Sequence, residues 1–304
     1  MMHHPVDAVM LARRAASFTR RSIKAESKNK GLRLAVSMVD LTTLEGADSP
    51  ELARALCRRA ISPAPSPIDP PVPSVAAVCV YPRLVPIVRE ALAGSSVKTA
   101  SVATSFPSGQ VPLDTRLRET EAAIAAGADE IDMVISRGAF LAGRFDEVAA
   151  EIRAVQDVCG ETHLKIILET GELETPDNIR RCADLAIEAA TKGREVADGA
   201  IFVKTSTGKI SPAATMPSIL LLLEAVRHHF RETGIRIGVK PAGGIRKSKA
   251  ALHILVMVRE TVGPEWLNPQ LFRIGASSLL DDLIRQLLWT SRGHYAAMHD
   301  VAVI

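Results

Sequence analysis

Short apolar runs alternate with amphipathic stretches along most of the chain. Eight runs have the length and apolar content of buried strands, and most of them are followed by a segment with helical periodicity, the first of these helices covering 50–60. The predicted strands are 34–39, 75–80, 99–103, 130–135, 163–168, 200–203, 236–239 and 271–274. About eight strand–helix units is the count of a closed parallel barrel, although an open doubly wound sheet shows the same local alternation.

Two features favour the closed barrel. No GxGxxG turn follows the first predicted strand, so the dinucleotide-binding form of the open sheet lacks its main signal. Polar and ionisable residues also stand at the carboxyl ends of many different strands, and a barrel gathers such ends at one mouth. These residues are Asp40, Asp132, Glu169, Lys204, Lys240 and Ser277. The sequence therefore predicts an α/β fold of the (β/α)8 TIM-barrel class.

The segments outside the repeat are assigned in the same way. Val9, Leu11 and Ile23 fit an extra N-terminal helix, which we favour over a transit peptide even though four arginines lie nearby. The proline-rich stretch 62–74 joins a helix to a strand, so we expect a rigid surface loop there and not a domain boundary. We predict one domain over 1–304, with a flexible tail at 293–304.

Composition narrows the class of protein. The 304 residues are 47% hydrophobic with a formal net charge of +3, which is ordinary for a globular protein and gives no reason to expect nucleic acid as a partner. No apolar run approaches the length of a membrane span, so no membrane partner is expected. The four cysteines form no CxxC pair and the histidines no HxH or HExxH spacing, which predicts no disulfide framework, no metal and no cofactor. We expect a cytoplasmic location and, without a sequence feature that localises the interface, a homodimer.

Lys204 is the first candidate for chemistry. It ends a predicted strand in the segment FVKTSTGK, after Ile201, Phe202 and Val203. Burial disfavours the charged form of a lysine and leaves a nucleophilic amine available at neutral pH. A lysine at a strand end can equally extend its ammonium group into solvent, so this segment alone leaves both interpretations open.

The next strand changes that balance. It ends in GVKPAGG, and in a parallel sheet its lysine, Lys240, lies beside Lys204. Two neighbouring ammonium groups repel, which lowers the pKa of at least one of them and activates it toward a carbonyl substrate. The pair therefore indicates Schiff-base chemistry. Lys165, in LKIILET on the preceding strand, adds a third cation deeper in the interior.

A buried cluster of cations requires counter-charges. Asp40 in VDLTTLEGAD and Asp132 in EIDMVI provide them from other strands. With a water molecule, an aspartate can also move the protons that imine formation and hydrolysis require. A structural ion pair is the alternative for Asp132, and we favour the catalytic role.

Glycines in three loops after strands predict a phosphate site. Glycine lets backbone amides approach an anion, and the loops after the last two strands, with a helix beginning near Ser277, are where barrels commonly bind phosphate. Lys209 adds a cation that can reach the same anion. The predicted phosphate-binding residues are Gly208, Lys209, Gly243, Gly244, Gly275, Ser277 and Ser278.

From Met38 to Asp282 the chain resembles the deoxyribose-phosphate aldolase family, which forms Schiff bases. The resemblance rests on seven segments in the family's order and with similar spacing: MVDLTTL, VCVYPRLVPI, ETEAAIAAGADEIDMVI, LKIILETGEL, FVKTSTGK, GVKPAGGIR and RIGASSLL. It implies reversible cleavage of 2-deoxy-D-ribose 5-phosphate to acetaldehyde and D-glyceraldehyde 3-phosphate, in deoxyribonucleotide catabolism.

The resemblance also implies roles for particular residues. Lys204 would form the imine, Lys240 would depress its pKa, Asp132 would relay protons, and Asp40 and Lys165 would support them. The glycine-loop residues given above match the family's phosphate-binding positions.

The chain departs from the family pattern at ISRGAF after the fourth strand and in the proline-rich loop. Tyr295 precedes an apolar stretch that ends at Ile304, so we assign it no role, and Cys79 reads as a buried, inert thiol. Two alternatives stay open, a Schiff-base barrel aldolase for another phosphosugar and a non-catalytic phosphosugar-binding barrel. The second has no use for two lysines and an aspartate held together.

Overall fold

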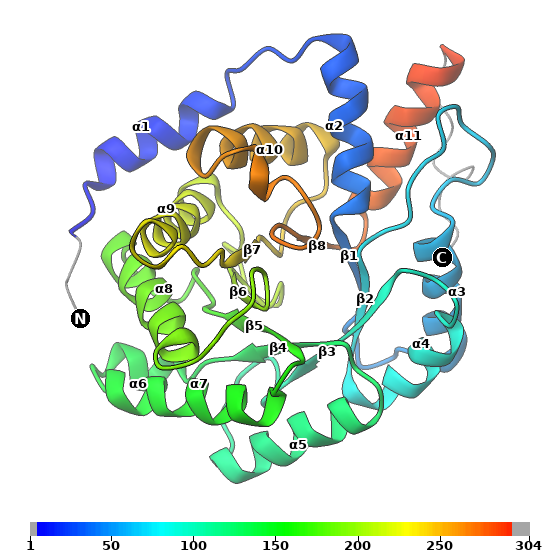
Figure 1. The fold of residues 1–304 in the computed structure, drawn as a ribbon. Coiled ribbons are helices and arrows are strands. Elements are labelled where there is room, and N and C mark those ends of the chain that lie inside the picture. Colours follow the sequence, from blue (N-terminus) through cyan, green and yellow to red (C-terminus); the bar gives the residue numbers. More distant parts are fainter. Residues whose placement is uncertain (1–4, 294–304) are drawn as a thin grey trace.

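The computed structural model describes residues 5–293, in which eight parallel strands form a barrel surrounded by helices (Figure 1). The strands pair in the order β7-β6-β5-β4-β3-β2-β1-β8. Isolated bridges from Val239 to Phe272 and from Ala242 to Gly275 join β7 to β8 and complete the ring. The strands are β1 Val39–Thr42, β2 Ala77–Val80, β3 Lys98–Ala103, β4 Glu130–Val134, β5 His163–Ile167, β6 Ile201–Lys204, β7 Gly238–Lys240 and β8 Ile274–Ala276. The predicted TIM-barrel class is confirmed.

Helices follow the strands and cover the outside of the barrel (Figure 1). The helices are α1 Ala8–Phe18, α2 Ala25–Ser37, α3 Pro50–Ile61, α4 Val85–Ala91, α5 Leu113–Ala125, α6 Arg137–Leu141, α7 Phe145–Cys159, α8 Pro176–Thr191, α9 Met216–Thr233, α10 Ser248–Thr261 and α11 Leu279–Arg292. Two short 3-10 helices, η1 Pro82–Leu84 and η2 Pro264–Trp266, lie in connections.

Local sequence signals explain where several helices begin and end. The hydroxyls of Ser49 and Thr175 accept from backbone amides at the starts of α3 and α8, and a proline follows each at the first helical position. Thr215 and Ser218 cap α9 reciprocally. Gly234 ends α9 with φ +76, a conformation that glycine adopts without a steric penalty. These signals fix the helix lengths and hence the positions of the loops at the barrel mouth.

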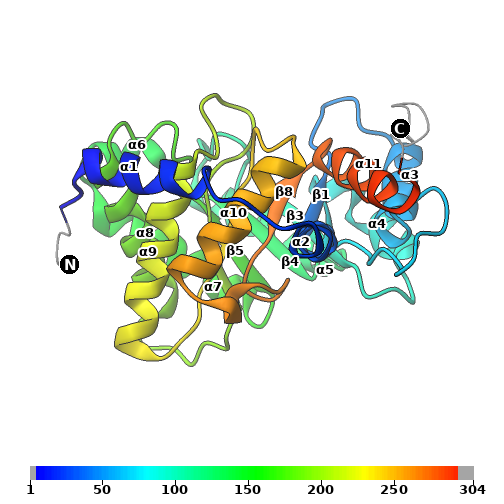
Figure 2. The ribbon, with the colours of Figure 1, turned by 90° about the horizontal axis from the view of Figure 1, so that it is seen from above.

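The N-terminal region contains two helices where the sequence predicts one. α1 packs on α9 and α10, and α2 packs on α10 and α11, so both add to the outer layer (Figure 2). The expectation of a strand at 34–39 is wrong for 34–37, which belong to α2. Leu32, Ala35 and Val36 are buried at helical spacing, so the apolar run is one face of a helix.

The other predicted strands lie within a few residues of the observed ones. The last two are shifted most, since β7 begins at Gly238 and β8 at Ile274. Residues 62–76 connect α3 to β2 without a helix or strand, and Ile68 and Val75 within this connection are buried. The tail predicted at 293–304 and Tyr295 lie outside the described residues, apart from Gly293. Among residues 5–293, no helix combines the length and hydrophobicity that crossing a membrane requires.

Candidate active site

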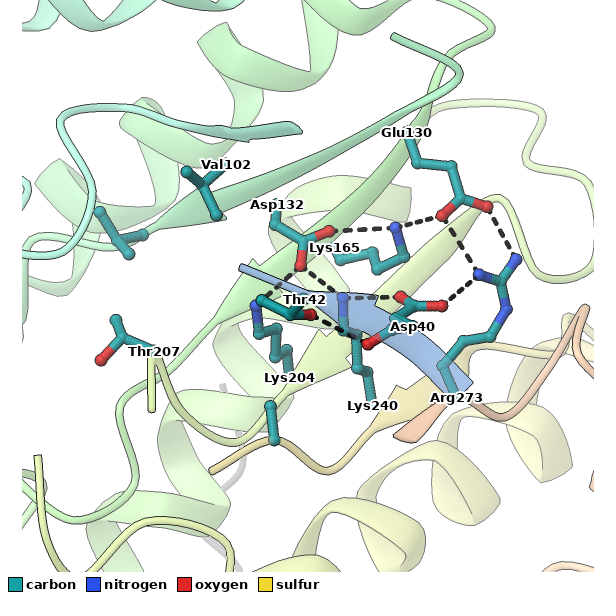
Figure 3. A network of polar contacts seen from close by, with 12 residues as sticks. Asp40, Thr42, Val102, Glu130, Asp132, Lys165, Lys204, Thr207, Lys240 and Arg273 are labelled. Carbon is teal, nitrogen blue, oxygen red and sulfur yellow. Dashed lines mark hydrogen bonds and ion pairs between the residues drawn. The ribbon is translucent and has the colours of Figure 1, made fainter. Parts of the chain in front are cut away.

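Lys204 and Lys240 end adjacent strands and project together into the barrel. They are direct partners in the parallel register of β6 and β7. Both Nζ atoms lie 2.7 Å from the same oxygen, Oδ2 of Asp132 on β4 (Figure 3). Lys204 is 2% exposed, and Lys240 and Asp132 are fully buried. Two amines therefore share one carboxylate oxygen in the buried interior of the barrel.

A second group of charges lies beyond this trio. Lys165 on β5 donates to Oδ1 of Asp132 at 3.0 Å and to Oε2 of Glu130 at 2.6 Å. Asp40 on β1 places Oδ2 2.6 Å from Nζ of Lys240. Arg273 joins the two outer carboxylates, with Nη1 2.7 Å from Oδ1 of Asp40 and Nη2 2.7 Å from Oε1 of Glu130 (Figure 3). The five charged residues predicted from the sequence thus belong to one continuous network.

The carboxylates occupy a different depth from the one that the sequence analysis assigned. Asp40 is the second residue of β1 and Asp132 the third of β4, so neither ends its strand. Glu130 and Asp132 alternate with Ile131 and point to the same side of the strand, into the lumen. The lysine amines reach inward from the strand ends to carboxylates within the barrel.

The surroundings of Lys204 and Lys240 shift their pKa values in opposite directions. Burial is the main cause that lowers the pKa of Lys204; Asp132 opposes it, and Lys240 adds to the lowering. Burial also opposes the charged form of Lys240, but Asp132 and Asp40 outweigh it and raise its pKa. Burial disfavours ionisation of Asp132 as well, and the three surrounding lysines nevertheless hold its pKa well below the ordinary value. Lys204 is thereby favoured as the neutral amine and Lys240 as the cation.

A cavity of about 360 Å³ opens from Lys204 to the surface. All seven residues predicted to bind phosphate line it, together with Thr42, Thr43 and Thr207. Ser278 is the N-cap of α11, whose first turn therefore faces the cavity. Free backbone amides and the positive end of the helix dipole favour an anion there. The loops after β6, β7 and β8 converge on one wall, as the sequence predicts.

Close backbone packing explains two of the glycines. A Cβ at Gly275 would lie 2.8 Å from Cβ of Ala242 and 3.2 Å from Cε of Lys240. Gly243 has φ +89, and a Cβ there would lie 2.6 Å from Cβ of Ala213. A side chain at either position would push the glycine-containing loops apart or displace Lys240.

Cations stand at the rim of this cavity. Lys209 Nζ lies 2.8 Å from Oε1 of Glu45, so that carboxylate partly compensates its charge. Arg246 also lines the cavity, is exposed, and makes no ion pair with any residue in 5–293. Arg246 was not predicted from the sequence, although it stands two residues after the glycine pair of GVKPAGGIR, and its place in that segment was the available signal.

Glu169 supports the loop after β6. Its carboxylate is buried and accepts from the backbone amide of Thr207 at 3.3 and 3.2 Å, from Ser206 Oγ at 2.5 Å and from the Thr207 hydroxyl. Arg137 Nη1 lies 3.7 Å away. Glu169 adopts φ +56, which is uncommon for a residue with a side chain. The sequence analysis placed Glu169 at a strand end but gave it no role.

Glu130 and Arg273 are the other residues that the sequence analysis missed. Glu130 stands two positions before Asp132, and Arg273 two before Gly275, so strand alternation alone indicates that each faces the lumen with its neighbour. Cys79 on β2 is buried near the same charges, and burial raises the pKa of its thiol to about 11. The four cysteines are free and buried.

Comparisons with known proteins agree with this architecture and site. The DeoC/LacD family aldolase profile matches residues 34–283. Curated deoxyribose-phosphate aldolases of Mus musculus and Homo sapiens are each 43% identical to the chain, over 97% and 99% of its length and 92% and 93% of theirs.

Solved structures give the same result for the fold. A crystal structure from Toxoplasma gondii ME49, provisionally assigned as a deoxyribose-phosphate aldolase, superposes with a TM-score of 0.73 at 25% identity, covering 89% of this chain and 98% of that one. The deoxyribose phosphate aldolase of Aeropyrum pernix, described as a tetramer, shares the fold with a TM-score of 0.59 at 22% identity, covering 86% and 97%. The chain belongs to the DeoC/LacD family of aldolases.

Proposed function

We propose that this aldolase is a deoxyribose-phosphate aldolase that cleaves 2-deoxy-D-ribose 5-phosphate reversibly to acetaldehyde and D-glyceraldehyde 3-phosphate through an imine on Lys204. The observation that carries the proposal is the position of Lys204. Its side chain is buried and lines the same cavity as the glycines of the loops after β6 and β7. The names and near-complete coverage of the curated relatives support the substrate.

The first step is attack by the neutral Lys204 amine on C1 of the open-chain sugar. The lone pair of Nζ forms the C–N bond while the carbonyl electrons move to oxygen, which takes up a proton. Loss of water from this carbinolamine gives the iminium ion. Asp132, 2.7 Å from Nζ, lies where it can exchange these protons directly or through one water molecule.

The second step breaks the bond between C2 and C3. A base removes the proton from the C3 hydroxyl, C3 becomes the aldehyde carbon of glyceraldehyde 3-phosphate, and the bonding pair moves into the iminium to form an enamine. Protonation at C2 and addition of water then release acetaldehyde and return Lys204 to its free form. Each proton taken up is matched by one released, so one carboxyl group with water serves the cycle.

The phosphate of the substrate would bind between the loops after β6, β7 and β8. Gly208, Gly243 and Gly244 offer backbone amides, the α11 N-terminus adds its dipole, and Lys209 and Arg246 add charge. Binding energy at this end of the sugar holds C1 near Lys204. A location in the cytoplasm, a part in deoxyribonucleotide catabolism and a homodimeric state remain predictions.

Replacing Lys204 with leucine tests the proposal. Wild-type protein should release acetaldehyde from 2-deoxyribose 5-phosphate, whereas Lys204→Leu should lose at least about 10³-fold in kcat and still bind the sugar phosphate. Coupled detection of acetaldehyde and calorimetric titration of sugar-phosphate binding measure the two properties. Wild-type protein that binds the sugar phosphate without cleaving it would instead be a phosphosugar-binding barrel, and cleavage of a different phosphosugar alone would indicate a different aldolase.

A further inference from the structure

The charges inside the barrel are unequal in number if every group is ionised. Among residues 5–293, three carboxylates face the lumen, and four basic side chains pair with them. The carboxylates are Asp40, Glu130 and Asp132, and the basic groups are Lys165, Lys204, Lys240 and Arg273. None of the seven is more than 5% exposed. An uncompensated charge is strongly disfavoured in such an interior, so one of the four basic groups is under pressure to lose its proton.

Arg273 makes no contact with Lys204. Its guanidinium bridges Asp40 and Glu130 at 2.7 Å each, on the side of the network away from Lys204 (Figure 3). The remaining oxygens of those two carboxylates pair with Lys240 and Lys165, both at 2.6 Å. Each outer carboxylate is therefore shared between Arg273 and one lysine. Arginine keeps its proton under all ordinary conditions, so its charge is a fixed part of the count.

We propose that Arg273 is a positioning residue whose permanent charge completes a balance of three cations and three carboxylates, so that Lys204 is the lumen amine left neutral. The proposal rests on the proposed function, in which Lys204 must be neutral to attack the substrate. It extends that function to residues deeper in the barrel, because the protonation state of Lys204 then depends on Arg273 and its partner Glu130, which do not contact Lys204.

The electrostatic environment of each group agrees with this count. Burial opposes ionisation at all three carboxylates, yet the neighbouring cations hold the pKa of each below its ordinary value. Burial likewise opposes the charged forms of Lys165, Lys240 and Arg273, yet the carboxylates raise the pKa of each. At Lys204 alone burial prevails and the pKa is lowered.

Other titratable groups beside the network do not change the count. His163 on β5 faces Glu130, Lys165 and Arg273, and burial lowers its pKa, which favours the neutral ring at pH 7. Cys79 on β2 keeps its proton because burial raises its pKa. Lys98, at the start of β3, is exposed to solvent and is therefore not counted among the buried charges. Glu45, Lys209 and Arg246 line the cavity that Lys204 faces, but all three are exposed at its rim. Among residues 5–293, the balance inside the lumen therefore involves the seven residues.

Four proteins test the proposal: wild type, Arg273→Met, Glu130→Gln and the double variant. The readout is the pH dependence of acetylation of Lys204 by acetic anhydride, followed by mass spectrometry, because only the neutral amine reacts and no catalytic activity is needed. Arg273→Met removes a cation, so Lys204 should hold its proton to a pH about one unit higher. Glu130→Gln removes an anion and should shift the midpoint downward by a similar amount. The double variant should lie near wild type.

The pair formed by Arg116 on α5 and Glu151 on α7 is the matched control. Both side chains are buried and hydrogen bonded to each other, but they lie outside the barrel wall. Arg116→Met and Glu151→Gln should alter stability without moving the Lys204 midpoint. Shifts of the same size from this control pair would overturn the proposal, since the effect would then not belong to the lumen.

Failure to fold is also informative. The balance predicts that the double variant folds even where a single variant does not, because the double variant leaves no uncompensated charge. Opposite shifts in the two single variants support the proposal, as does a folded double variant beside an unfolded single one. Unshifted or parallel midpoints, or a double variant that does not fold, overturn it. Wild-type protein that does not cleave 2-deoxyribose 5-phosphate would refute the proposed function and leave this labelling result intact.

Discussion

Lys204 and Lys240 occupy the same register level at the ends of neighbouring strands, and their amines contact one and the same carboxylate oxygen. Parallel pairing forces this juxtaposition, since the side chains of register partners point to the same face of the sheet. One carboxylate oxygen cannot fully compensate two ammonium groups in an interior of low polarity. Lys240 has Asp40 as a second counter-ion, whereas Lys204 pairs with no other carboxylate among residues 5–293. This asymmetry favours Lys204 as the nucleophile.

Removal of the Lys240 charge should change the pH dependence of catalysis. In the proposed mechanism Lys204 reacts as the neutral amine, so kcat/KM should rise as the pH increases through its folded-state pKa, which lies below the ordinary 10.5. Lys240→Met removes one cause of that lowering, so the pKa rises and the acidic limb of the profile moves to higher pH. Activity at neutral pH should fall at least about 10²-fold.

Lys240→Arg is the control for this variant, because it keeps a positive charge at the end of β7. Its acidic limb should stay closer to that of wild type, although the altered geometry will reduce kcat. A Lys240→Met enzyme with the wild-type acidic limb would show that the second lysine does not set the state of the first.

Arg246 should contribute to binding the phosphate group. Arg246→Gln should lower kcat/KM for 2-deoxyribose 5-phosphate about tenfold, mainly through KM, because it removes a charge-assisted contact at the cavity rim. Activity toward unphosphorylated 2-deoxyribose, however small, should not change. Lys247→Gln is the matched control, since Lys247 is the next residue, is exposed and does not line the cavity. Equal losses on both sugars would remove Arg246 from the phosphate site.

Glu169 should hold the loop that carries Gly208 and Lys209. Glu169→Ala removes the acceptor for the Thr207 amide and for two hydroxyls, which leaves those donors buried without a partner. We expect KM for the phosphorylated sugar to rise about tenfold or more and the free energy of unfolding to fall by roughly 1–3 kcal/mol.

Glu174→Ala is the control for Glu169→Ala. Glu174 lies on the same loop as Glu169, between β5 and α8, is exposed and also has positive φ. Steady-state kinetics and urea denaturation measure both variants. An unchanged KM in a destabilised Glu169→Ala protein would limit Glu169 to a structural role.

Much of the fold follows from the sequence because short apolar runs alternate with segments of helical periodicity along most of the chain. The predicted strand boundary is wrong at 34–37, where the buried face of a helix reads as an apolar run. Leu32, Ala35 and Val36 form that helical face. The depth of Asp40 and Asp132 within their strands depends on tertiary register, which local pattern does not give. The loops proposed to bind phosphate could be predicted because Gly208, Gly243 and Gly244 each come shortly after a strand.

Only part of the charge network could be predicted from the sequence. Lys204, Lys240 and Asp132 stand in segments that signal chemistry, whereas strand alternation indicates only which side of the sheet Glu130 and Arg273 face, not their partners. Only the closed barrel brings positions 40, 130 and 273 together, over separations of up to 233 residues. Their pairing is a property of closure, and no spacing within the sequence encodes it.

Reductive trapping tests the central claim most directly. The protein is incubated with 2-deoxyribose 5-phosphate, reduced with borohydride and mapped by peptide mass spectrometry. The account predicts a single covalent adduct on Lys204, formed in wild-type protein and absent in Lys204→Leu. An adduct on Lys240 in its place, or no adduct on folded protein with the substrate intact, would contradict the assignment of Lys204 as the imine-forming residue.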